Sequence, residues 1–315
     1  MKKIIVNEYG SVDVLKEIDV PMPTPKSDEV VIKVAAFGIN DPDIVMRKNG
    51  PFPTMPKEMR PTLPHMLGND FSGIVSQVGS NVIKFKVGDH VVGFSMQGSN
   101  AEYLTLNQNG VVITVPEDLD LVPLGGLLLG AVTAWSAVVL NGKIQAGQKI
   151  LIHGGAGGVG TMAIQIAKNL GAYVITTAKA KHTEYLKELG ADEIIDYQTQ
   201  DFTKMVHDLD LVVNLTGSRT LDQSYQVIKP GGILTSVNGV PDPKKAAKFG
   251  IQAVYAMGDV SNNTITEILK MYVAGKLQVN VSQTYPFVLK DVKQAHLDFE
   301  KGSNQGKRII VLNTK

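Results

Sequence analysis

The sequence contains no cysteine, and neither sign of charge dominates it. Without cysteine the chain has no disulfide framework and no thiolate metal site, which fits the cytoplasm. The 31 basic and 30 acidic side chains leave a net charge of +1. This balance produces no field that would draw the protein to nucleic acid or to an anionic membrane. We therefore expect a cytoplasmic protein with no nucleic-acid and no membrane partner.

Long apolar runs are also scarce. The N-terminal segment has only three apolar residues after its two lysines, too few for a signal peptide, and it predicts a first β-strand. Residues 121–140 carry no charge and, at about 20 residues, have the length of a membrane span. One proline and three glycines interrupt them. We expect a buried connecting helix there.

The segment from Lys149 to Gly160 joins an apolar strand to a glycine-rich turn and the start of a helix. Gly155, Gly157 and Gly160 fit the pattern G-x-G-x-x-G. This pattern gives a tight turn, a backbone that can approach phosphate oxygens, and close packing of the helix on the sheet. The N-terminus of the helix favours negative charge. The segment therefore predicts a dinucleotide site, with the pyrophosphate on the turn.

The residues on either side of this turn predict two domains. Residues 1–120 contain short apolar or alternating runs separated by turn residues, which is typical of a mostly antiparallel β domain. From residue 148 strands alternate with helices, which predicts an α/β domain with a doubly wound parallel sheet that binds ligand at the carboxyl ends of its strands. We expect a cofactor domain at 121–262 and a first domain at 1–120 that is completed by 263–315. The six strand candidates are Lys149–His153, Tyr173–Thr177, Glu193–Tyr197, Asp210–Asn214, Ile233–Val237 and Val254–Met257.

The end of the second of these strands indicates which nicotinamide cofactor binds. In NAD-binding proteins of this kind an Asp or Glu at that point accepts a hydrogen bond from the ribose 2′-hydroxyl. Here no carboxylate occurs before Glu184, whereas Lys179 and Lys181 stand where a 2′-phosphate needs countercharge. We therefore expect NADP(H). Tyr197, at the end of the third strand, either contacts that phosphate or packs. Further candidate cofactor residues at strand ends are Thr177, Thr216 and Val237.

The order of motifs along nearly the whole chain resembles the medium-chain dehydrogenase/reductase superfamily, and within it the zinc-free quinone oxidoreductase (zeta-crystallin-like) branch. The resemblance implies a GroES-like first domain, a Rossmann second domain and hydride transfer. The motifs that carry it, besides the glycine turn, are Gly38-Ile-Asn-Asp-Pro-Asp43, Leu67-Gly-Asn-Asp-Phe-Ser-Gly-Ile-Val75, Val87-Gly-Asp-His-Val-Val-Gly93, Ala131-Val-Thr-Ala-Trp135 and Glu188-Leu-Gly-Ala-Asp192.

Zinc-dependent members of that superfamily typically have Gly-Ile-Cys at the first of these motifs and Gly-His-Glu at the second. Asn40 stands in place of the cysteine, and Asn69 and Asp70 replace the His-Glu pair. An amide is a poor zinc ligand beside thiolate or imidazole. We therefore expect no metal. Without a Lewis acid, alcohol oxidation is disfavoured, and hydride donation to a quinone or an enone remains feasible.

The resemblance also implies individual site residues. Asn40 is expected near the nicotinamide and the substrate, where it is the candidate catalytic residue, because the oxygen that gains negative charge needs a donor. Thr133 is expected near the nicotinamide ribose. The residues expected on the pyrophosphate are Ala156, Gly157, Gly158 and Val159, with Gly155 in the turn before them.

The sequence also permits two other functions, and it predicts an oligomeric state. The same hydride chemistry suits an enoyl-thioester reductase, and an intact cofactor motif also suits a non-catalytic NADPH-binding protein of the crystallin kind. The favoured function is an NADPH-dependent reductase of small quinones or α,β-unsaturated carbonyl compounds. The apolar strand at 253–257 predicts an edge that natural proteins seldom leave open. We therefore expect a homodimer.

Overall fold

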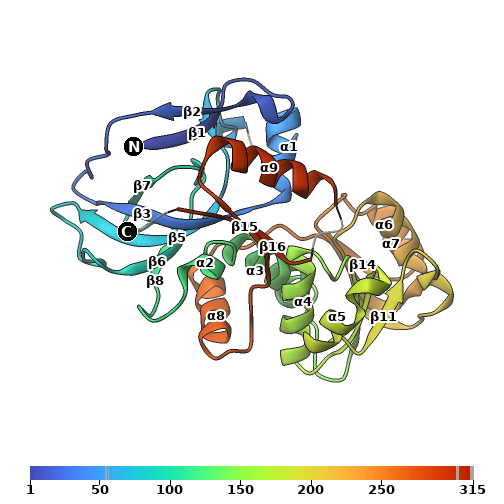
Figure 1. Cartoon of the computed structure of the whole chain (residues 1–315). Coiled ribbons are helices and arrows are strands. Elements are labelled where there is room, and N and C mark those ends of the chain that lie inside the picture. The colour runs from blue at the N-terminus through green and yellow to red at the C-terminus, as the bar shows by residue number, and fades with distance from the viewer. Residues whose placement is uncertain (54, 56, 303–304, 313–315) are drawn as a thin grey trace. The chain divides into compact units, whose positions relative to one another are not determined.

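A computed structural model describes residues 1–53, 55, 57–302 and 305–312 (Figure 1). The chain forms two compact units. Unit 1 consists of Met1–Leu129, Val281–Gly302 and the residues from Lys307 onward; unit 2 consists of Gly130–Asn280 and a short segment ending at Gly306. From the sequence we expect domain boundaries after residue 120 and after residue 262. In the structure residues 121–129 belong to unit 1, and residues 263–280 belong to unit 2.

Two β-sheets form unit 1. Strand β3 is the longest and crosses the centre of the larger sheet, where it pairs antiparallel with β5, β7 and β16. The larger sheet has the order β15-β16-β3-β5-β6-β8, with β7 also on β3, and the smaller has the order β2-β1-β4. The expected mostly antiparallel domain is confirmed. The strands are β1 (Lys2–Val6), β2 (Leu15–Asp19), β3 (Glu29–Ile39), β4 (His65–Met66), β5 (Asp70–Val78), β6 (His90–Phe94), β7 (Tyr103–Asn107), β8 (Val112–Thr114), β15 (Val281–Pro286) and β16 (Lys307–Val311).

Apolar side chains from both sheets and two helices make up one core in unit 1, around Ile32, Phe37 and Phe71. Helix α1 (Asp41–Asn49) begins directly after β3, and α9 (Leu289–Glu300) contributes Val292 and Ala295 to the same core. An ion pair from Arg47 of α1 to Glu300 links the two helices. Two 3₁₀ turns (Val12–Val14 and Lys57–Met59) and α2 (Leu121–Leu124) complete the unit.

A parallel sheet of six strands forms unit 2. Its order is β11-β10-β9-β12-β13-β14, and every neighbouring pair is parallel. In chain order this is 3-2-1-4-5-6, the order of the doubly wound dinucleotide-binding fold, so the predicted fold class is confirmed. The strands are β9 (Lys149–His153), β10 (Tyr173–Ala178), β11 (Glu193–Asp196), β12 (Leu209–Asn214), β13 (Ile228–Ser236) and β14 (Gln252–Tyr255).

Helices alternate with these strands. Two of them, α4 and α8, are twelve residues long, and positions 160–167 of α4 are all buried because it follows β9 and packs on the sheet. Short 3₁₀ turns occupy Ala180–His182, Phe202–Lys204 and Tyr225–Val227. The helices are α3 (Leu128–Trp135), α4 (Gly158–Asn169), α5 (Thr183–Glu188), α6 (Ser218–Ser224), α7 (Pro243–Lys248) and α8 (Asn262–Val273).

The uncharged stretch 121–140 forms three short helical segments instead of one connecting helix. It consists of α2, α3 and a π-helical turn, Ser136–Leu140. Gly125 ends α2, and a Cβ there would come within 2.6 Å of the backbone of Ala36, so the glycine permits a close approach that sequence periodicity does not reveal. Within the described residues, helices that combine enough length with enough apolar character to span a membrane are absent.

Two glycines of the turn after β9 differ in what they do for the fold. A Cβ at Gly160 would lie 2.3 Å from the carbonyl oxygen of Gly154, which is backbone and cannot move away cheaply. A Cβ at Gly157 would lie 3.5 Å from that oxygen, and φ there is −74°. We predict that Gly160→Ala lowers the free energy of unfolding by about 1–3 kcal/mol. Gly157→Ala should cost less than about 1 kcal/mol, the effect of alanine at an N-cap. Urea unfolding measures both, and equal losses would contradict the assignment.

Candidate functional site

The glycine turn is tied to the next strand by backbone hydrogen bonds. The N–H groups of Gly154 and Gly155 both donate to the carbonyl of Thr177, at 3.2 and 3.1 Å. Gly154 has a φ of +79°, which glycine adopts without strain. A Cβ at Gly155 would come within 2.0 Å of the Thr176 hydroxyl oxygen, so this position also requires glycine.

The first turn of α4 presents backbone N–H groups that no side chain caps. Gly157 is the N-cap residue and makes no side-chain cap hydrogen bond. The uncapped N–H groups and the positive end of the helix dipole together suit an anion. Ala156, next to this N-cap, accepts a hydrogen bond from Gly306 N–H at 2.9 Å, so the segment that ends at Gly306 lies against the turn.

A buried histidine connects the turn to the rest of the sheet. His153, at the end of β9, is fully buried, and burial lowers its pKa to about 4, so the ring is neutral at pH 7. Its Nδ1 lies 3.2 Å from the Thr177 hydroxyl and its Nε2 lies 3.1 Å from the Ser224 hydroxyl. The Thr177 hydroxyl also accepts from Gly154 N–H at 3.3 Å. The hydroxyl of this predicted cofactor residue is thus engaged in fixing the turn.

The basic residues after β10 lie at the same edge of the sheet as the turn, because the strands are parallel. Lys179 is the N-cap of the turn Ala180–His182, and Lys181 is exposed. Tyr197 directly follows β11 and is 54% exposed. Partial burial, with a smaller contribution from Asp196, raises the pKa of the Tyr197 phenol, which therefore stays a neutral donor at pH 7.

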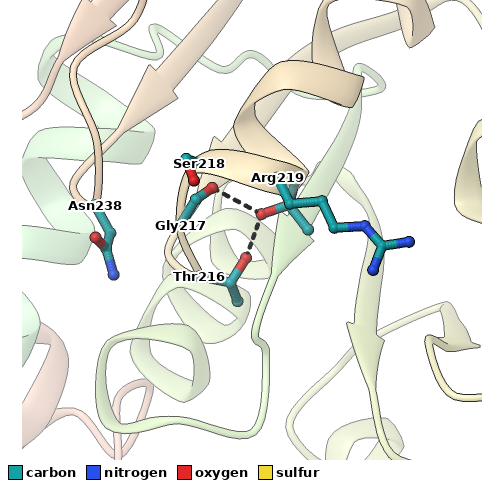
Figure 2. Close-up of a pocket in the computed structure, with 6 residues that line it drawn as sticks. Thr216, Gly217, Ser218, Arg219 and Asn238 are labelled. Carbon is teal, nitrogen blue, oxygen red and sulfur yellow. Dashed lines mark hydrogen bonds between the residues drawn. The ribbon is translucent and has the colours of Figure 1, made fainter.

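A shallow pocket of about 480 Å³ lies at the carboxyl ends of β12 and β13 (Figure 2). Thr216, Gly217, Ser218, Arg219, Thr220 and Asn238 line it. The buried Asn214 organises this pocket: its side chain donates to the carbonyls of Gly217 and Asn238, at 3.2 and 3.0 Å. The Thr216 hydroxyl faces Thr220 at 2.6 Å, and Figure 2 shows the Arg219 side chain pointing away from Asn238.

The other predicted cofactor residues of unit 2 have mixed environments. Val237 is half-buried just after β13, and its N–H donates to the carbonyl of Asn214 at 3.1 Å. Thr133 is half-buried on α3, next to Gly258, where a Cβ would come within 3.2 Å of its hydroxyl oxygen. The structure therefore brings the strand-end candidates of β9 to β13 to one edge of the sheet.

Asn40, the candidate catalytic residue, lies in unit 1 within a buried polar network. Its amide Nδ2 donates to Asp70 Oδ1 at 3.0 Å and to the carbonyl of Gly38 at 3.3 Å. Its Oδ1 accepts from the ammonium of Lys307. Because carboxylate and ammonium partners lie on opposite sides of the amide, they fix which way the amide points. Asp70 Oδ2 accepts in addition from Leu129 N–H at 3.1 Å.

Asp43 adjoins this network at the start of α1. Its two carboxylate oxygens accept from the N–H groups of Asn40 and Gly68, at 2.7 and 2.8 Å. Burial raises the pKa of Asp43 to about 7; the two N–H donors and Lys307 oppose this shift, and the charge of Asp70 adds to it. The folded state therefore keeps a carboxyl group that is partly protonated near neutral pH.

A second cavity, also of about 480 Å³, lies wholly within unit 1. Its polar lining comes from Lys3, Asp43, Thr62, His65, Asn69 and Gln97, with Gly68 beside Asn69. Much of the remaining wall is apolar and flexible, because Met46, Met55, Met66 and Met96 contribute to it together with Ile5, Ile18, Val20, Pro61, Pro64 and Leu67. Methionine side chains adapt to ligands of irregular shape. The volume is that of a small-molecule site.

Sequence reasoning missed Lys307, Gly306 and the pair Arg219 and Asn238. Lys307 had one usable signal, its place at the start of a strand whose last three residues are apolar. Gly306 and Asn238 belong to loops, and Arg219 lies in the first turn of α6, so no local pattern indicates any of them. His65, the imidazole nearest to the zinc-ligand motifs, lies in the cavity wall. In the described part of the chain no three His, Asp or Glu side chains lie close enough together to hold a metal ion.

Comparison with known families supports the fold. Three family models match: alcohol dehydrogenase GroES-like domain at residues 26–139, zinc-binding dehydrogenase at 189–310, and the C-terminal domain of alanine dehydrogenase/PNT at 130–218. The last of these covers the glycine turn. The second is named for zinc binding, but its range does not include Asn40, Asn69 or Asp70, which lie in the range of the first.

Individual proteins match almost the whole chain. The chain is 32% identical to the chloroplastic NADPH-dependent alkenal/one oxidoreductase of Arabidopsis thaliana and 33% identical to the 2-methylene-furan-3-one reductase of Solanum lycopersicum; each match covers 98% of this chain and 79% of the relative. The solved structure of the quinone oxidoreductase from Coxiella burnetii superposes with a TM-score of 0.90, at 30% identity, over 99% of both chains. The chain therefore belongs to the medium-chain dehydrogenase/reductase superfamily, in its zinc-free quinone oxidoreductase branch.

Proposed function

We propose that the protein is an NADPH-dependent, metal-independent reductase that transfers hydride to small quinones or α,β-unsaturated carbonyl compounds. The observation that carries the proposal is the uncapped N-terminus of α4 beside Gly155 and Gly157, with two lysines and no carboxylate at the end of the next strand. Relatives at about a third identity support it, one of which is named NADPH-dependent and acts on alkenals and alkenones.

The residues of unit 2 fit this cofactor. Bound NADPH supplies a hydride from its nicotinamide ring. The first-turn N–H groups of α4 and the turn residues Gly155 to Val159 hold the pyrophosphate, and Lys179, Lys181 and Tyr197 hold the 2′-phosphate. Thr177, Thr216 and Val237 line the edge of the sheet along which the nucleotide extends, and Thr133 lies at the nicotinamide ribose.

The acceptor class follows from the donors available in unit 1. Two amides, Asn40 and Asn69, and one carboxylate, Asp70, replace the zinc-ligand set, so the chain offers no strong Lewis-acid centre for a simple ketone or alcohol. The acceptor must then carry its own electron sink, as quinones and enones do. Asn40 is proposed beside the nicotinamide and the acceptor, and the methionine-lined cavity accommodates the apolar part of the acceptor.

We predict a preference for NADPH over NADH of at least about tenfold in affinity, or about 1.4 kcal/mol, since a charge-assisted contact to the 2′-phosphate supplies that much. Lys181→Ala should remove most of the preference. Lys187→Ala is the matched control, because Lys187 lies six positions further along the chain, is exposed, and has Glu184 at 3.8 Å as its one ion-pair partner among the described residues. Fluorescence titration of the unchanged chain and both variants with NADPH and NADH measures all six affinities. Equal binding of both cofactors to the unchanged chain would sink the NADPH assignment.

The substrate class is tested by NADPH consumption with small quinones, alkyl enones, enoyl thioesters, simple ketones and saturated alcohols. We expect turnover with quinones or enones, negligible reaction with ketones and alcohols, and no loss of rate after dialysis against a chelator. Turnover confined to enoyl thioesters would favour the enoyl-thioester reductase instead. Saturable NADPH binding with no consumption would indicate a binding protein.

We also propose a homodimer formed along β14. This strand is the edge of the six-stranded sheet, and it pairs only with β13 among the described residues. Tyr255 is 38% exposed and Met257 72% exposed, so the edge offers apolar side chains beside its unpaired backbone groups. Light scattering at micromolar concentration should give twice the chain mass of 33.9 kDa or a multiple of that dimer. A monomer mass would refute the proposal.

The compartment proposed is the cytoplasm. The absence of cysteine is compatible with it. One relative has a name that places it in the chloroplast, so members of this family occur in more than one compartment.

A further inference from the structure

Lys307 is a buried cation without an anionic partner. Its side chain is 4% exposed, yet it takes part in no ion pair within 4.0 Å among the described residues. Its only hydrogen-bond acceptor in that part of the chain is the neutral amide oxygen of Asn40. Two of the three N–H bonds of the ammonium group therefore remain available to donate. A buried charge of this kind is costly to fold unless something compensates it.

The fold makes specific room for this side chain. Gly38 and Gly126 flank its aliphatic stem, and a Cβ at either would come within 3.3 or 3.1 Å of Lys307 Cε. A Cβ at Gly38 would also come within 3.2 Å of Asp70 Oδ1. Two glycines, one from β3 and one from the segment after α2, thus bring the lysine against Asn40.

The neighbouring carboxylates leave much of the lysine charge unneutralised. Asp70 is engaged by Asn40 Nδ2 and by Leu129 N–H, and it reaches Lys307 only through the amide. Asp43 is the second carboxyl group nearby, and both its oxygens already accept N–H groups of the backbone. Burial keeps its pKa near 7, so its negative charge is only partial at neutral pH.

The chain also links Lys307 directly to the cofactor turn. It immediately follows Gly306, whose N–H donates to the carbonyl of Ala156 at 2.9 Å. Consecutive Cα atoms are about 3.8 Å apart. In the sequence, Lys307 is therefore the next residue after a backbone contact of the turn proposed to carry the pyrophosphate.

Asn40 is less suited to act as the donor itself. One hydrogen of its Nδ2 is directed to a carboxylate at 3.0 Å and the other to a backbone carbonyl at 3.3 Å. Donating to a substrate would require breaking one of these bonds. The ammonium group has free donors and a full charge, and charge-assisted hydrogen bonds are roughly twice as strong as neutral ones.

We propose that the Lys307 ammonium donates to the carbonyl oxygen of the acceptor and stabilises the negative charge that forms there, while Asn40 holds the ammonium in position. This rests on the proposed function. A hydride with its electron pair forms a C–H bond at the β-carbon of an enone, and NADP⁺ remains. The C=C electrons shift to give an enolate, with its charge largely on oxygen. Water then protonates the α-carbon, and the saturated ketone leaves.

The kinetic test compares Lys307→Met with Lys84→Met. Both changes replace an ammonium with a thioether of similar length, and Lys84 is an exposed residue of unit 1 that donates to Asn109 and to no other described residue. For alkyl enones we expect Lys307→Met to lower kcat about 100-fold, the scale on which loss of one oxyanion donor acts. With acceptors that carry strong electron-withdrawing substituents, kcat should fall much less, because these acceptors stabilise their own oxyanion. Lys84→Met should behave as the unchanged chain does.

The outcomes separate the two proposals. If the unchanged chain reduces no quinone or enone, the proposed function fails. If the unchanged chain reduces them, two results would refute only the role of Lys307. One is that Lys307→Met lowers kcat by the same factor with every acceptor; the other is that it leaves kcat unchanged. A steeper dependence of kcat on acceptor substituents in Lys307→Met, with the affinity for NADPH retained, supports that role, because a merely structural defect would not follow the electronics of the acceptor.

A second measurement does not depend on how well the variant folds. Bound to the complex of the unchanged chain with NADP⁺, p-nitrophenol serves as an analogue of the oxyanion. A donor that carries positive charge should favour its ionised form, so the phenolate absorbance should appear at a pH at least about one unit below that at which the free phenol ionises, a shift equal to tenfold in affinity. Binding in the neutral form only would overturn the proposal.

Discussion

Unit 2 depends on the close approach of α4 to the turn that follows β9. Gly160 lies so near the Gly154 carbonyl that any side chain there would collide with backbone. This contact sets the start of α4, and its uncapped N–H groups then face outward at the carboxyl edge of the sheet. Because all six strands are parallel, the ends of the other strands reach the same edge. The proposed phosphate site and the strand-end residues Lys181, Tyr197 and Thr216 therefore lie at one edge of the sheet.

Most of this organisation could be predicted from the sequence because its causes are local. The apolar strand, the glycine spacing and the helical periodicity lie within about twenty residues of one another, and each signals a definite geometry. The π-helical end of the stretch 121–140 was not predictable in this way. There the backbone of Ala36, far away in the sequence, comes against Gly125, and tertiary contact overrides the uniform apolar pattern.

The network around Asn40 shows the same limit. Its motif identified Asn40 and Asp70, but Lys307, which is 267 positions away, completes the network because β16 pairs antiparallel with β3. Local sequence cannot reveal such a partner. The consequence is chemical: an amide that looked like a free donor has both hydrogens engaged, and the unpaired charge lies on a residue without a recognisable motif. A buried ammonium gives the reductase a positive group for an oxyanion in a site that lacks zinc ligands.

The most direct test of this account is to follow the transferred hydrogen. NADPH carrying deuterium at the transferable position of its nicotinamide is incubated with the protein and an acyclic enone, and the product is analysed by NMR. The account predicts deuterium at the β-carbon, a solvent proton at the α-carbon and an intact ketone. Deuterium at the carbonyl carbon, with formation of an allylic alcohol, would contradict it, because that product requires the strong carbonyl activation that these residues do not provide.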